Sequence, residues 1–412
     1  MSLTTSSRFA SAIDYGTDWR DTSKKVLEQL EQARTENDGF NIGFIYVSDH
    51  LCDDLSSILS LFKSVLNIEN WCGCVGMGIC GNGIEYIDKP AISVMIGHID
   101  NEQFCIFPSG DIDDGKAAKA LEPWMNHHEP FVVLTHGNPV MDTNPANVLG
   151  KLEELVGGFL IGGLASSRSE HACIADNIGD SGVCGVAFSQ EMQISCALSQ
   201  GCAPIGDAHT ITKCHDHTIT EIDSKPALEI FENDLRQMAI KKKGTSPSKI
   251  SAISYENEDD DEETKDHEQL FKGEVHTAFL VKGSDQGEFL VRNLLSIDEE
   301  SKSIDVAQSA QPGDRILFVH RDNNTVKEDL SRTLCQLHER VLRENGEFSP
   351  KGAIYISCVA RAFSDFGNID RTGEMTLIKE IIGDVPLTGF YASGEINAGR
   401  LYGYTGVLLL FL

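Results

Sequence analysis

The sequence predicts a mixed α/β fold, with mixed sheets built from repeated β-α-β-β units and arranged in two lobes. The chain has 412 residues, enough for two ordinary domains or one large two-lobed domain. Hydrophobic residues make up 41% of it, so a packed core can form. A pattern of strand, helix, strand with a glycine-rich turn, and strand occurs three times at similar internal spacing, which indicates related subdomains.

The first copy of the pattern begins with an apolar strand at residues 44–48. A helical stretch follows from Asp53 to Leu66, then a glycine-rich turn at residues 71–83 and a return strand from Ala91 to Ile96. A strand, a helix and a second strand in succession predict a right-handed crossover with parallel pairing. The short Gly/Asn/Asp-rich link between the last two strands predicts a hairpin between them.

The second and third copies follow the same order of elements. The second has a strand at 131–135, a helix at 145–155, a strand with its glycine turn at 159–166 and a closing strand at 182–188. The third has the corresponding segments at 352–359, 376–382, 386–395 and 407–411.

The block between the second and third copies differs from them. It includes a predicted strand at 192–198 and a predicted helix at 325–343, where Thr325 and Glu328 fit a capping box. Residues 241–268 are rich in charge and poor in apolar side chains, so we expect a disordered acidic loop. Whether its acidic stretch at 256–268 docks a basic partner stays open.

Charge and cysteine usage exclude several classes of protein. Lys and Arg total 34 against 63 Asp and Glu, a net charge of −29, which argues against nucleic-acid and anionic-membrane partners. The twelve cysteines are scattered through strand-like segments, and the polar start of the chain lacks a secretory signal. The apolar run at 406–412 is too short to cross a bilayer. We therefore expect a cytoplasmic protein with reduced thiols.

Several linked motifs resemble one family. Residues 200–206, with Thr210-Ile-Thr212 and the segment 222–227, are similar to the central signature of FIST-domain proteins. Residues 356–361, 386–390 and 394–396 resemble the FIST C-terminal domain. Residues 71–76 and 157–163 resemble its N-terminal domain, so the resemblance runs from about residue 39 to the end.

The resemblance implies a lead segment at 1–38, a FIST N-terminal domain at 39–222 and a FIST C-terminal domain at 223–412. Bacterial members of the family are regarded as sensory modules that bind small ligands, and some are haem proteins that sense nitric oxide and regulate a histidine kinase. Eukaryotic relatives carry an F-box, for which residues 1–38 are too few. The expected function is therefore a small-ligand sensor that acts through a separate signalling protein such as a histidine kinase.

A haem-based nitric oxide sensor is the first alternative, and its iron would need an axial ligand. His209 lies inside a family motif and is the weak favourite, with His136 as a second candidate. No nucleotide site is expected, because Gly76, Gly78 and Gly81 precede a turn and a strand rather than a helix. The cysteine and histidine clusters do not fit zinc spacing, and the metal question stays open.

The candidate ligand-binding residues follow predicted strands of the repeats. Arg361 could hold a carboxylate and Glu395 an ammonium group, or the two could form a structural ion pair with each other. The turn of the second repeat would line the same cleft. The full candidate set is Arg361, Glu395, Gly394, Gly162, Gly163, Ser166 and Arg168.

Enzyme activity is the second alternative. No common catalytic string occurs in the sequence, which favours a protein without enzyme activity. Cys358 could act as a nucleophile only if a histidine base such as His320 lay beside it.

Overall fold

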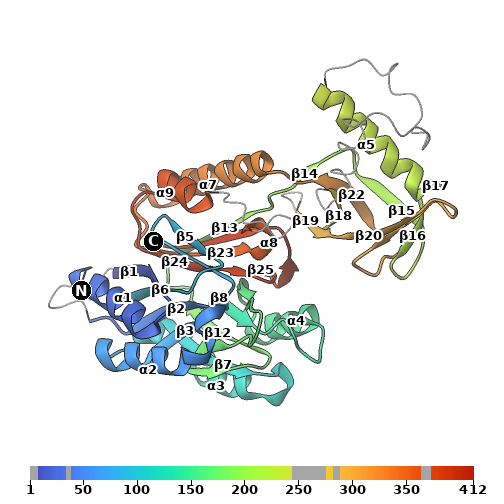
Figure 1. The fold of residues 1–412 in the computed structure, drawn as a ribbon. Coiled ribbons are helices and arrows are strands. Elements are labelled where there is room, and N and C mark those ends of the chain that lie inside the picture. Colours follow the sequence, from blue (N-terminus) through green and yellow to red (C-terminus); the bar gives the residue numbers. More distant parts are fainter. Residues whose placement is uncertain (1–7, 34–38, 244–274, 282–287, 363–372) are drawn as a thin grey trace. The chain divides into compact units, whose positions relative to one another are not determined.

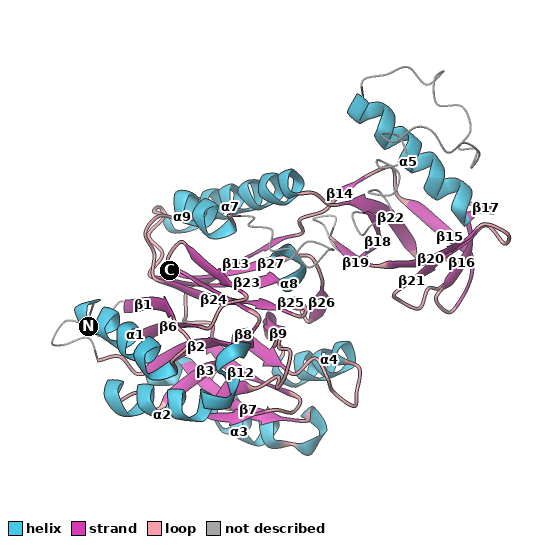
Figure 2. Ribbon diagram, viewed as in Figure 1, coloured by secondary structure: helices cyan, strands magenta, loops and turns pink. Residues whose placement is uncertain are grey.

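The computed structural model describes residues 8–33, 39–243, 275–281, 288–362 and 373–412. The chain divides into two compact units: unit 1 comprises residues 1–200 and 327–412, and unit 2 comprises residues 201–326. Helices pack on mixed β-sheets, which confirms the predicted α/β class (Figures 1 and 2).

Unit 1 contains three repeats, as the sequence predicts, and each begins earlier than expected, with an extra strand and a helix. Repeat 1 consists of β1 (Arg8–Tyr15), α1 (Trp19–Ala33), β2 (Ile42–Ser48), η1 (Asp49–Asp54), α2 (Leu55–Leu66), β3 (Asn70–Gly76), β4 (Gly78–Gly81), β5 (Ile84–Ile87) and β6 (Ala91–His98). Repeat 2 consists of η2 (Asn101–Gln103), β7 (Phe104–Gly110), η3 (Ile112–Asp114), α3 (Lys116–Met125), β8 (Pro130–Gly137), α4 (Pro145–Val156), β9 (Phe159–Leu164), β10 (Cys173–Ala175), β11 (Asn177–Gly179) and β12 (Val183–Ser189). Repeat 3 consists of β13 (Ile194–Ser199), α7 (Asn323–Asn345), β23 (Gly352–Cys358), α8 (Val359–Ala362), α9 (Glu374–Ile382), β24 (Leu387–Ala392), β25 (Glu395–Asn397), β26 (Arg400–Tyr402) and β27 (Gly406–Phe411). The predicted lead segment thus holds β1 and α1 of repeat 1.

Strand pairing inside each repeat is the same. The two long strands, β2/β3, β8/β9 and β23/β24, pair in parallel, which confirms the predicted parallel crossovers. The return strands β6, β12 and β27 pair antiparallel with the first long strand of their own repeat. The predicted hairpin between the last two strands is therefore wrong, because the return strand lies on the other side of the first strand.

Each glycine-rich turn instead forms its own two-stranded hairpin, which leaves its repeat and joins the sheet of another. Hairpin β4–β5 of repeat 1 pairs with β24 of repeat 3, and hairpin β10–β11 of repeat 2 pairs with β3 of repeat 1. Hairpin β25–β26 of repeat 3 pairs with β9 of repeat 2 and closes the cycle. The first sheet has the order β1-β6-β2-β3-β10-β11, the second β26-β25-β9-β8-β12-β7, and the third β13-β27-β23-β24-β4-β5.

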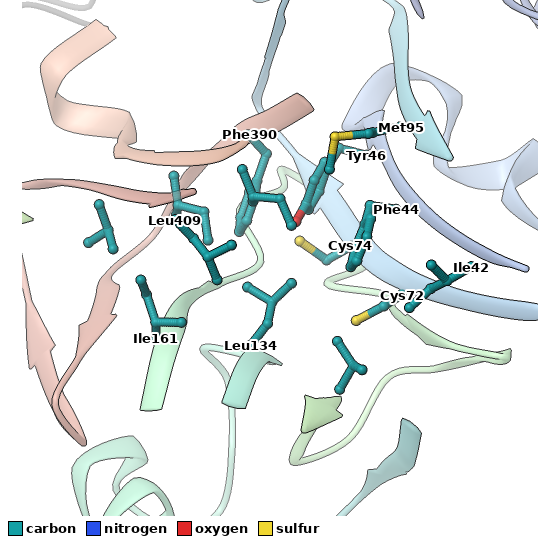
Figure 3. Packing of buried hydrophobic residues seen from close by; sticks show 14 of the residues in the cluster. Ile42, Phe44, Tyr46, Cys72, Cys74, Met95, Leu134, Ile161, Phe390 and Leu409 are labelled. Carbon is teal, nitrogen blue, oxygen red and sulfur yellow. The ribbon is translucent and has the colours of Figure 1, made fainter. Parts of the chain in front are cut away.

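One core lies between the three sheets. It contains Phe44 and Tyr46 of the first sheet, Leu134 of the second, and Phe390 and Leu409 of the third, all buried. Figure 3 shows these side chains converging from all three sheets. The opposite face of each sheet packs against its own helices: α1 and α2 on the first, α3 and α4 on the second, α7 and α9 on the third.

A glycine stands at the same place in the second long strand of each repeat, because the neighbouring backbone approaches it closely. A Cβ on Gly73 would lie 1.7 Å from the carbonyl oxygen of Ile45, and one on Gly162 would lie 1.8 Å from that of Thr135. Gly389 has the same relation to Tyr355, also at 1.8 Å. These three positions therefore require glycine.

Local sequence explains the helices well. In α2 the buried residues Leu55, Ile58, Leu59, Phe62 and Leu66 recur at helical spacing and form one apolar face. Helix α4 has Pro145 in its first turn, and the side chain of Asn144 accepts a hydrogen bond from the backbone N–H of Ala146. It ends at Gly157, whose φ of 64° is left-handed.

In its described residues, unit 2 is a sheet covered by a helix, and it is inserted between β13 and α7 of repeat 3. Its strands are β14 (Ala203–Pro204), β15 (His209–His215), β16 (Thr218–Ile222), β17 (Lys225–Pro226), β18 (Val275–Leu280), β19 (Phe289–Arg292), β20 (Leu294–Asp298), β21 (Ser303–Val306) and β22 (Arg315–His320), and its helix is α5 (Ala227–Lys243). In the described part of unit 2 the main path runs β19-β18-β22-β15-β16-β21-β20. In repeats 1 and 2 the segment between the first strand and the helix that follows it is short. It comprises residues 16–18 between β1 and α1, and residues 111–115 between β7 and α3.

Two expectations for this part of the chain need correction. Residues 241–243 belong to α5 rather than to a disordered loop, and the rest of the predicted acidic loop lies outside the described residues. Helix α7 begins at Asn323, and its cap is Asp322, whose Oδ1 accepts a hydrogen bond from the N–H of Thr325 at 2.8 Å. Thr325 is therefore inside the helix and is not the capping residue.

Candidate functional site

The candidate residues of repeat 3 follow the carboxyl ends of the parallel strands β23 and β24. Arg361 lies in α8, directly after Cys358 ends β23. Glu395 begins the exchanged hairpin, directly after Ser393 and Gly394 follow β24. In open α/β sheets this end of the strands is where ligands commonly bind.

Arg361 forms an ion pair with Glu374 of α9, a residue that the sequence analysis did not single out. Both side chains are fully buried, and Arg361 Nε and Nη2 lie 2.6 Å and 2.5 Å from Glu374 Oε1. The hydroxyls of Tyr355 and Ser357 donate to Glu374 Oε2 at 3.1 Å and 2.8 Å. Burial alone would lower the pKa of Arg361, but the Glu374 carboxylate outweighs it and raises that pKa above its ordinary value. The predicted ion pair between Arg361 and Glu395 is therefore wrong as a direct contact.

Glu395 is also fully buried, but its carboxyl group is only half satisfied. Oε2 accepts hydrogen bonds from the N–H and the hydroxyl of Thr405 at 3.1 Å and 2.7 Å. Oε1 has no partner at hydrogen-bond geometry among the described residues, although the weakly donating thiol of Cys358 lies beside the carboxyl group. Burial raises the pKa of Glu395 to about 8, and the Thr405 hydrogen bonds and Arg361 oppose this only in part.

The predicted glycines do lie against Glu395. Strand β25 pairs antiparallel with β9, with Glu395 opposite Gly163 and Ile396 opposite Gly162. The N–H of Leu164 donates to the carbonyl of Gly394 at 2.9 Å. The structure therefore brings Gly162, Gly163, Gly394 and Glu395 into one place, although they come from two different repeats.

Ser166 and Arg168 have other contacts. The hydroxyl of Ser166 donates to the carbonyl of Tyr391 at 2.5 Å and accepts from the N–H of Met77 at 2.8 Å. It thereby ties together the ends of β3, β9 and β24, one strand from each repeat. Arg168 forms ion pairs with Asp49 and Asp88, at 3.1 Å and 2.5 Å.

Sequence reasoning missed a strained residue beside Glu395. Tyr404, next to Thr405, has a φ of 64°, which is left-handed and unfavourable for a bulky side chain. Such backbone strain concentrates at functional sites. The adjoining Gly403 predicts a turn, but it does not predict that Tyr404 is the residue with the left-handed φ.

The catalytic alternative loses support at Cys358. Burial and the neighbouring Glu395 raise the pKa of the Cys358 thiol far above its ordinary value, which disfavours the nucleophilic thiolate. His320 belongs to unit 2, whereas Cys358 belongs to unit 1. Within unit 2, His320 Nε2 lies 2.9 Å from Asp322 Oδ2.

The haem alternative does not fit His209. Its Nδ1 lies 2.7 Å from Asp223 Oδ2 and its Nε2 lies 3.0 Å from Asp234 Oδ2, so both ring nitrogens already face a carboxylate partner and neither faces a space for iron. His136 is fully buried, with Tyr46 Oη at 3.1 Å from Nε2 and Cys72 Sγ at 3.5 Å from Nδ1. Burial lowers the pKa of His136 to about 3, which keeps the ring neutral.

Other features of the described residues add no competing site. They contain no group of three or more His, Cys, Asp or Glu side chains arranged to hold a metal ion. No helix in the described ranges is long and apolar enough to cross a membrane. The glycines Gly78 and Gly81 lie in β4, which leads through a turn into β5, as the sequence predicts.

Two hollows in unit 1 lie away from Glu395. One, of about 10 Å³, lies between α9 and the β4–β5 turn and holds at most a water molecule. The other is an open groove of about 520 Å³ between α1 and α2, lined by Lys24, Leu27, Glu28, Glu31, Gln32 and Leu61. Since Glu395 and Arg361 are fully buried, a ligand can reach them only if covering groups move.

Comparison with protein families decides the identity of the chain. The FIST N domain matches residues 41–225, and the FIST C domain matches residues 255–398. This protein belongs to the FIST family. FIST domains are associated with sensory roles in signal transduction.

The similar proteins match this FIST protein over nearly the whole length of both chains. An uncharacterized protein of Mycobacterium bovis is 27% identical over 405 residues, covering 95% of this chain and 96% of its own length. Another, of Mycobacterium tuberculosis, is 26% identical over 412 residues, covering 95% and 97%. Among solved structures, Thermotoga maritima PurL complexed with FGAR is 9% identical with a TM-score of 0.23, covering 98% of this chain and 72% of that one. So low a TM-score supports no argument about this protein.

Proposed function

We propose that this FIST protein is a cytosolic sensor that binds a small ligand at Glu395 and acts through a separate signalling protein, such as a histidine kinase. The observation that carries the proposal is the half-satisfied carboxyl group of Glu395. A fully buried carboxyl oxygen without a hydrogen-bond partner costs free energy, and a ligand that donates to it would remove that cost.

The other candidate residues have distinct parts in this proposal. Gly394, Gly162 and Gly163 would line the site, because they lie beside Glu395 where β25 pairs with β9. Arg361, Ser166 and Arg168 are positioning residues, since each already bonds to protein groups. A ligand with an ammonium group suits this site, because its charge would favour the ionised form of Glu395, whose Oε1 then accepts a hydrogen bond from it.

The enclosure of the site supports a sensory role. A ligand must displace covering groups to reach Glu395, so its binding is coupled to a change in the surrounding chain. The strained Tyr404 and its neighbour Thr405, which holds Glu395 Oε2, are the groups best placed to respond. Relief of the strain at Tyr404 would favour the ligand-bound arrangement.

Thermal unfolding of the purified chain with single amino acids tests the proposal. A ligand that binds only the native state raises the unfolding temperature, increasingly with concentration. We expect at least one amino acid to give such a shift, and Glu395→Gln to abolish it. Glu380→Gln, on the exposed side of α9, is the matched control and should keep the shift.

Two results would count against this function. An unfolding temperature that no amino acid changes removes the support for a ligand of this class. A shift that is equal in the wild type and in Glu395→Gln places the ligand elsewhere. Binding of a purified histidine kinase, measured with and without the ligand found, tests the partner separately.

A further inference from the structure

Cysteines gather where the exchanged hairpin of repeat 2 meets the first sheet. Cys72 and Cys74 lie on β3, Cys173 lies on the hairpin strand β10, and Cys184 lies on β12. All four are buried free thiols that belong to the shared core. Figure 3 shows the sulfur atoms of Cys72 and Cys74 inside this core.

Cys173 lies beside two other cysteines of this cluster. It stands directly opposite Cys74 in the antiparallel pairing of β10 with β3, and both side chains face the core. Opposed residues in such pairs have Cα atoms about 4.5–5.5 Å apart, within the range that a disulfide spans. The thiol of Cys184 donates a hydrogen bond to the carbonyl oxygen of Ile174, the residue after Cys173, at 3.7 Å.

The hairpin that carries Cys173 is short and lies at the edge of the first sheet. Strands β10 and β11 have three residues each, and β11 is the edge strand of the first sheet. Its residues Asn177 and Ile178 are exposed. Short edge hairpins open locally without unfolding the rest of the protein, which gives a small reagent access to Cys173.

We propose that Cys173 and Cys184 are a thiol oxidation site, at which a small hydroperoxide forms one disulfide between the exchanged hairpin and the second sheet. The thiolate sulfur of one cysteine attacks the terminal oxygen of the hydroperoxide, and the O–O bond breaks. This step leaves a sulfenic acid and an alkoxide, or hydroxide from hydrogen peroxide, which takes up the proton that the thiol lost. The second thiolate then attacks the sulfenic sulfur, the S–S bond forms, and the hydroxide that leaves takes up the second thiol's proton as water. Two thiols are oxidised by two electrons in total, and one peroxide bond is reduced.

The disulfide would link the exchanged hairpin β10–β11 covalently to strand β12 of the second sheet. Strand β10 pairs into the first sheet, whereas β12 lies in the second, so the bond joins two sheets of the core. The neighbouring thiol of Cys173 and burial hold the pKa of Cys184 well above its ordinary value. Oxidation is therefore slow at neutral pH and faster at pH 9.

Treatment of the native full-length protein with hydrogen peroxide tests the site. Thiols are then blocked in denaturant, and the remaining disulfides are mapped by mass spectrometry. We expect the number of free thiols to fall by two from the twelve of the reduced chain, with the Cys173–Cys184 peptide pair as the product. The loss should reverse with dithiothreitol.

Variants separate the site from general oxidation. Cys173→Ala should form no disulfide, whereas Cys184→Ala should form one between Cys173 and Cys74. Cys335→Ser, which removes an exposed thiol on α7, should behave like the wild type. Retention of all twelve thiols, or a wild-type disulfide other than Cys173–Cys184, overturns the proposal, and the wild-type map decides even if a core variant fails to fold.

Discussion

Glu374, and not Glu395, is the carboxylate that neutralises Arg361, with 2.5 Å between Arg361 Nη2 and Glu374 Oε1. The two acidic residues differ sharply in their surroundings. Glu374 accepts hydrogen bonds from Tyr355, Ser357 and Arg361, whereas Glu395 keeps one oxygen unpartnered among the described residues. One carboxylate is thus part of the framework, and the other is the candidate for ligand binding.

Removal of the Glu374 charge should destabilise unit 1 strongly. Glu374→Gln leaves the buried guanidinium of Arg361 without its counter-ion, and we expect a loss of about 3 kcal/mol in the free energy of unfolding. Urea unfolding followed by circular dichroism measures it. The exposed ion pair of Lys379 with Asp384 is the control, and Asp384→Asn should change the stability by less than about 0.5 kcal/mol. Equal effects of the two variants would contradict this assignment.

Glu395 should make stability fall as the pH rises. Its pKa is about 8 in the folded chain and near its ordinary value of 4.5 in the unfolded chain, so between these values the folded state holds the extra proton. The stabilisation is complete below pH 4.5 and is lost as the pH rises to about 8. Urea unfolding of wild type and Glu395→Gln from pH 5 to 9 checks this. The stability difference between them should change by about 1.4 kcal/mol per pH unit within the window. A difference that does not vary with pH would show that Glu395 is ionised in the folded protein.

His209 should have the related pH dependence in unit 2. Burial lowers its pKa, but the hydrogen bonds and charges of Asp223 and Asp234 outweigh burial and raise that pKa above 6.5. The stabilisation is fully present below pH 6.5 and disappears as the pH rises through the raised value. We expect His209→Gln to lose more stability at pH 5.5 than at pH 9, measured by differential scanning calorimetry. An equal loss at both pH values would mean that the ring is neutral.

The close approach of the Thr135 backbone to Gly162 predicts that one added methyl group strongly destabilises the protein. Gly162→Ala places a Cβ 1.8 Å from the carbonyl oxygen of Thr135, so β8 and β9 must separate. We expect a loss of about 3 kcal/mol or more in the free energy of unfolding. Gly150→Ala is the matched control, because its Cβ would meet nothing within 4 Å inside helix α4. That variant should gain about 0.5–1 kcal/mol, and a similar loss in both would refute the steric explanation.

Unit 1 should fold without unit 2. Residues 201–326 interrupt repeat 3 at a place where repeat 1 has only residues 16–18 and repeat 2 only residues 111–115. A chain in which a short Gly-Thr-Asp link replaces residues 201–326 should keep the three sheets. Its near-ultraviolet circular dichroism and cooperative thermal unfolding measure this. A shortened chain that lacks a cooperative transition would show that unit 2 is needed for the fold.

The repeats were predictable because their long strands are nearly continuous apolar runs, such as residues 44–48 and 352–358. Such runs indicate strands buried on both faces, and a helix between two of them indicates parallel pairing. The exchange of hairpins was not predictable, since the short segment 173–175 carries no signal that distinguishes β3 from its own repeat as the neighbour. The predicted domain boundary at 222/223 stays a prediction about the family domains, which differ from the two compact units.

The candidate site was predictable only in part. Arg361, Glu395 and the glycines stand at the ends of recognisable strands, which is a local signal. The residues that decide their chemistry, Glu374 and Thr405, contact them only through the tertiary fold. The left-handed φ of Tyr404 has no sequence signal, because turns favour glycine, asparagine or aspartate there.

The cyclic exchange of hairpins determines how many repeats are needed before every hairpin pairs with the sheet of another repeat. A single repeat contains a hairpin with no sheet to receive it and a sheet edge with no hairpin to cover it. Two repeats in one chain leave one such mismatch open. Three separate copies of such a repeat could reach this arrangement as a ring, each passing its hairpin to the next. With the three repeats in one chain the ring closes within that chain, and repeat 3 also accommodates the insertion of residues 201–326.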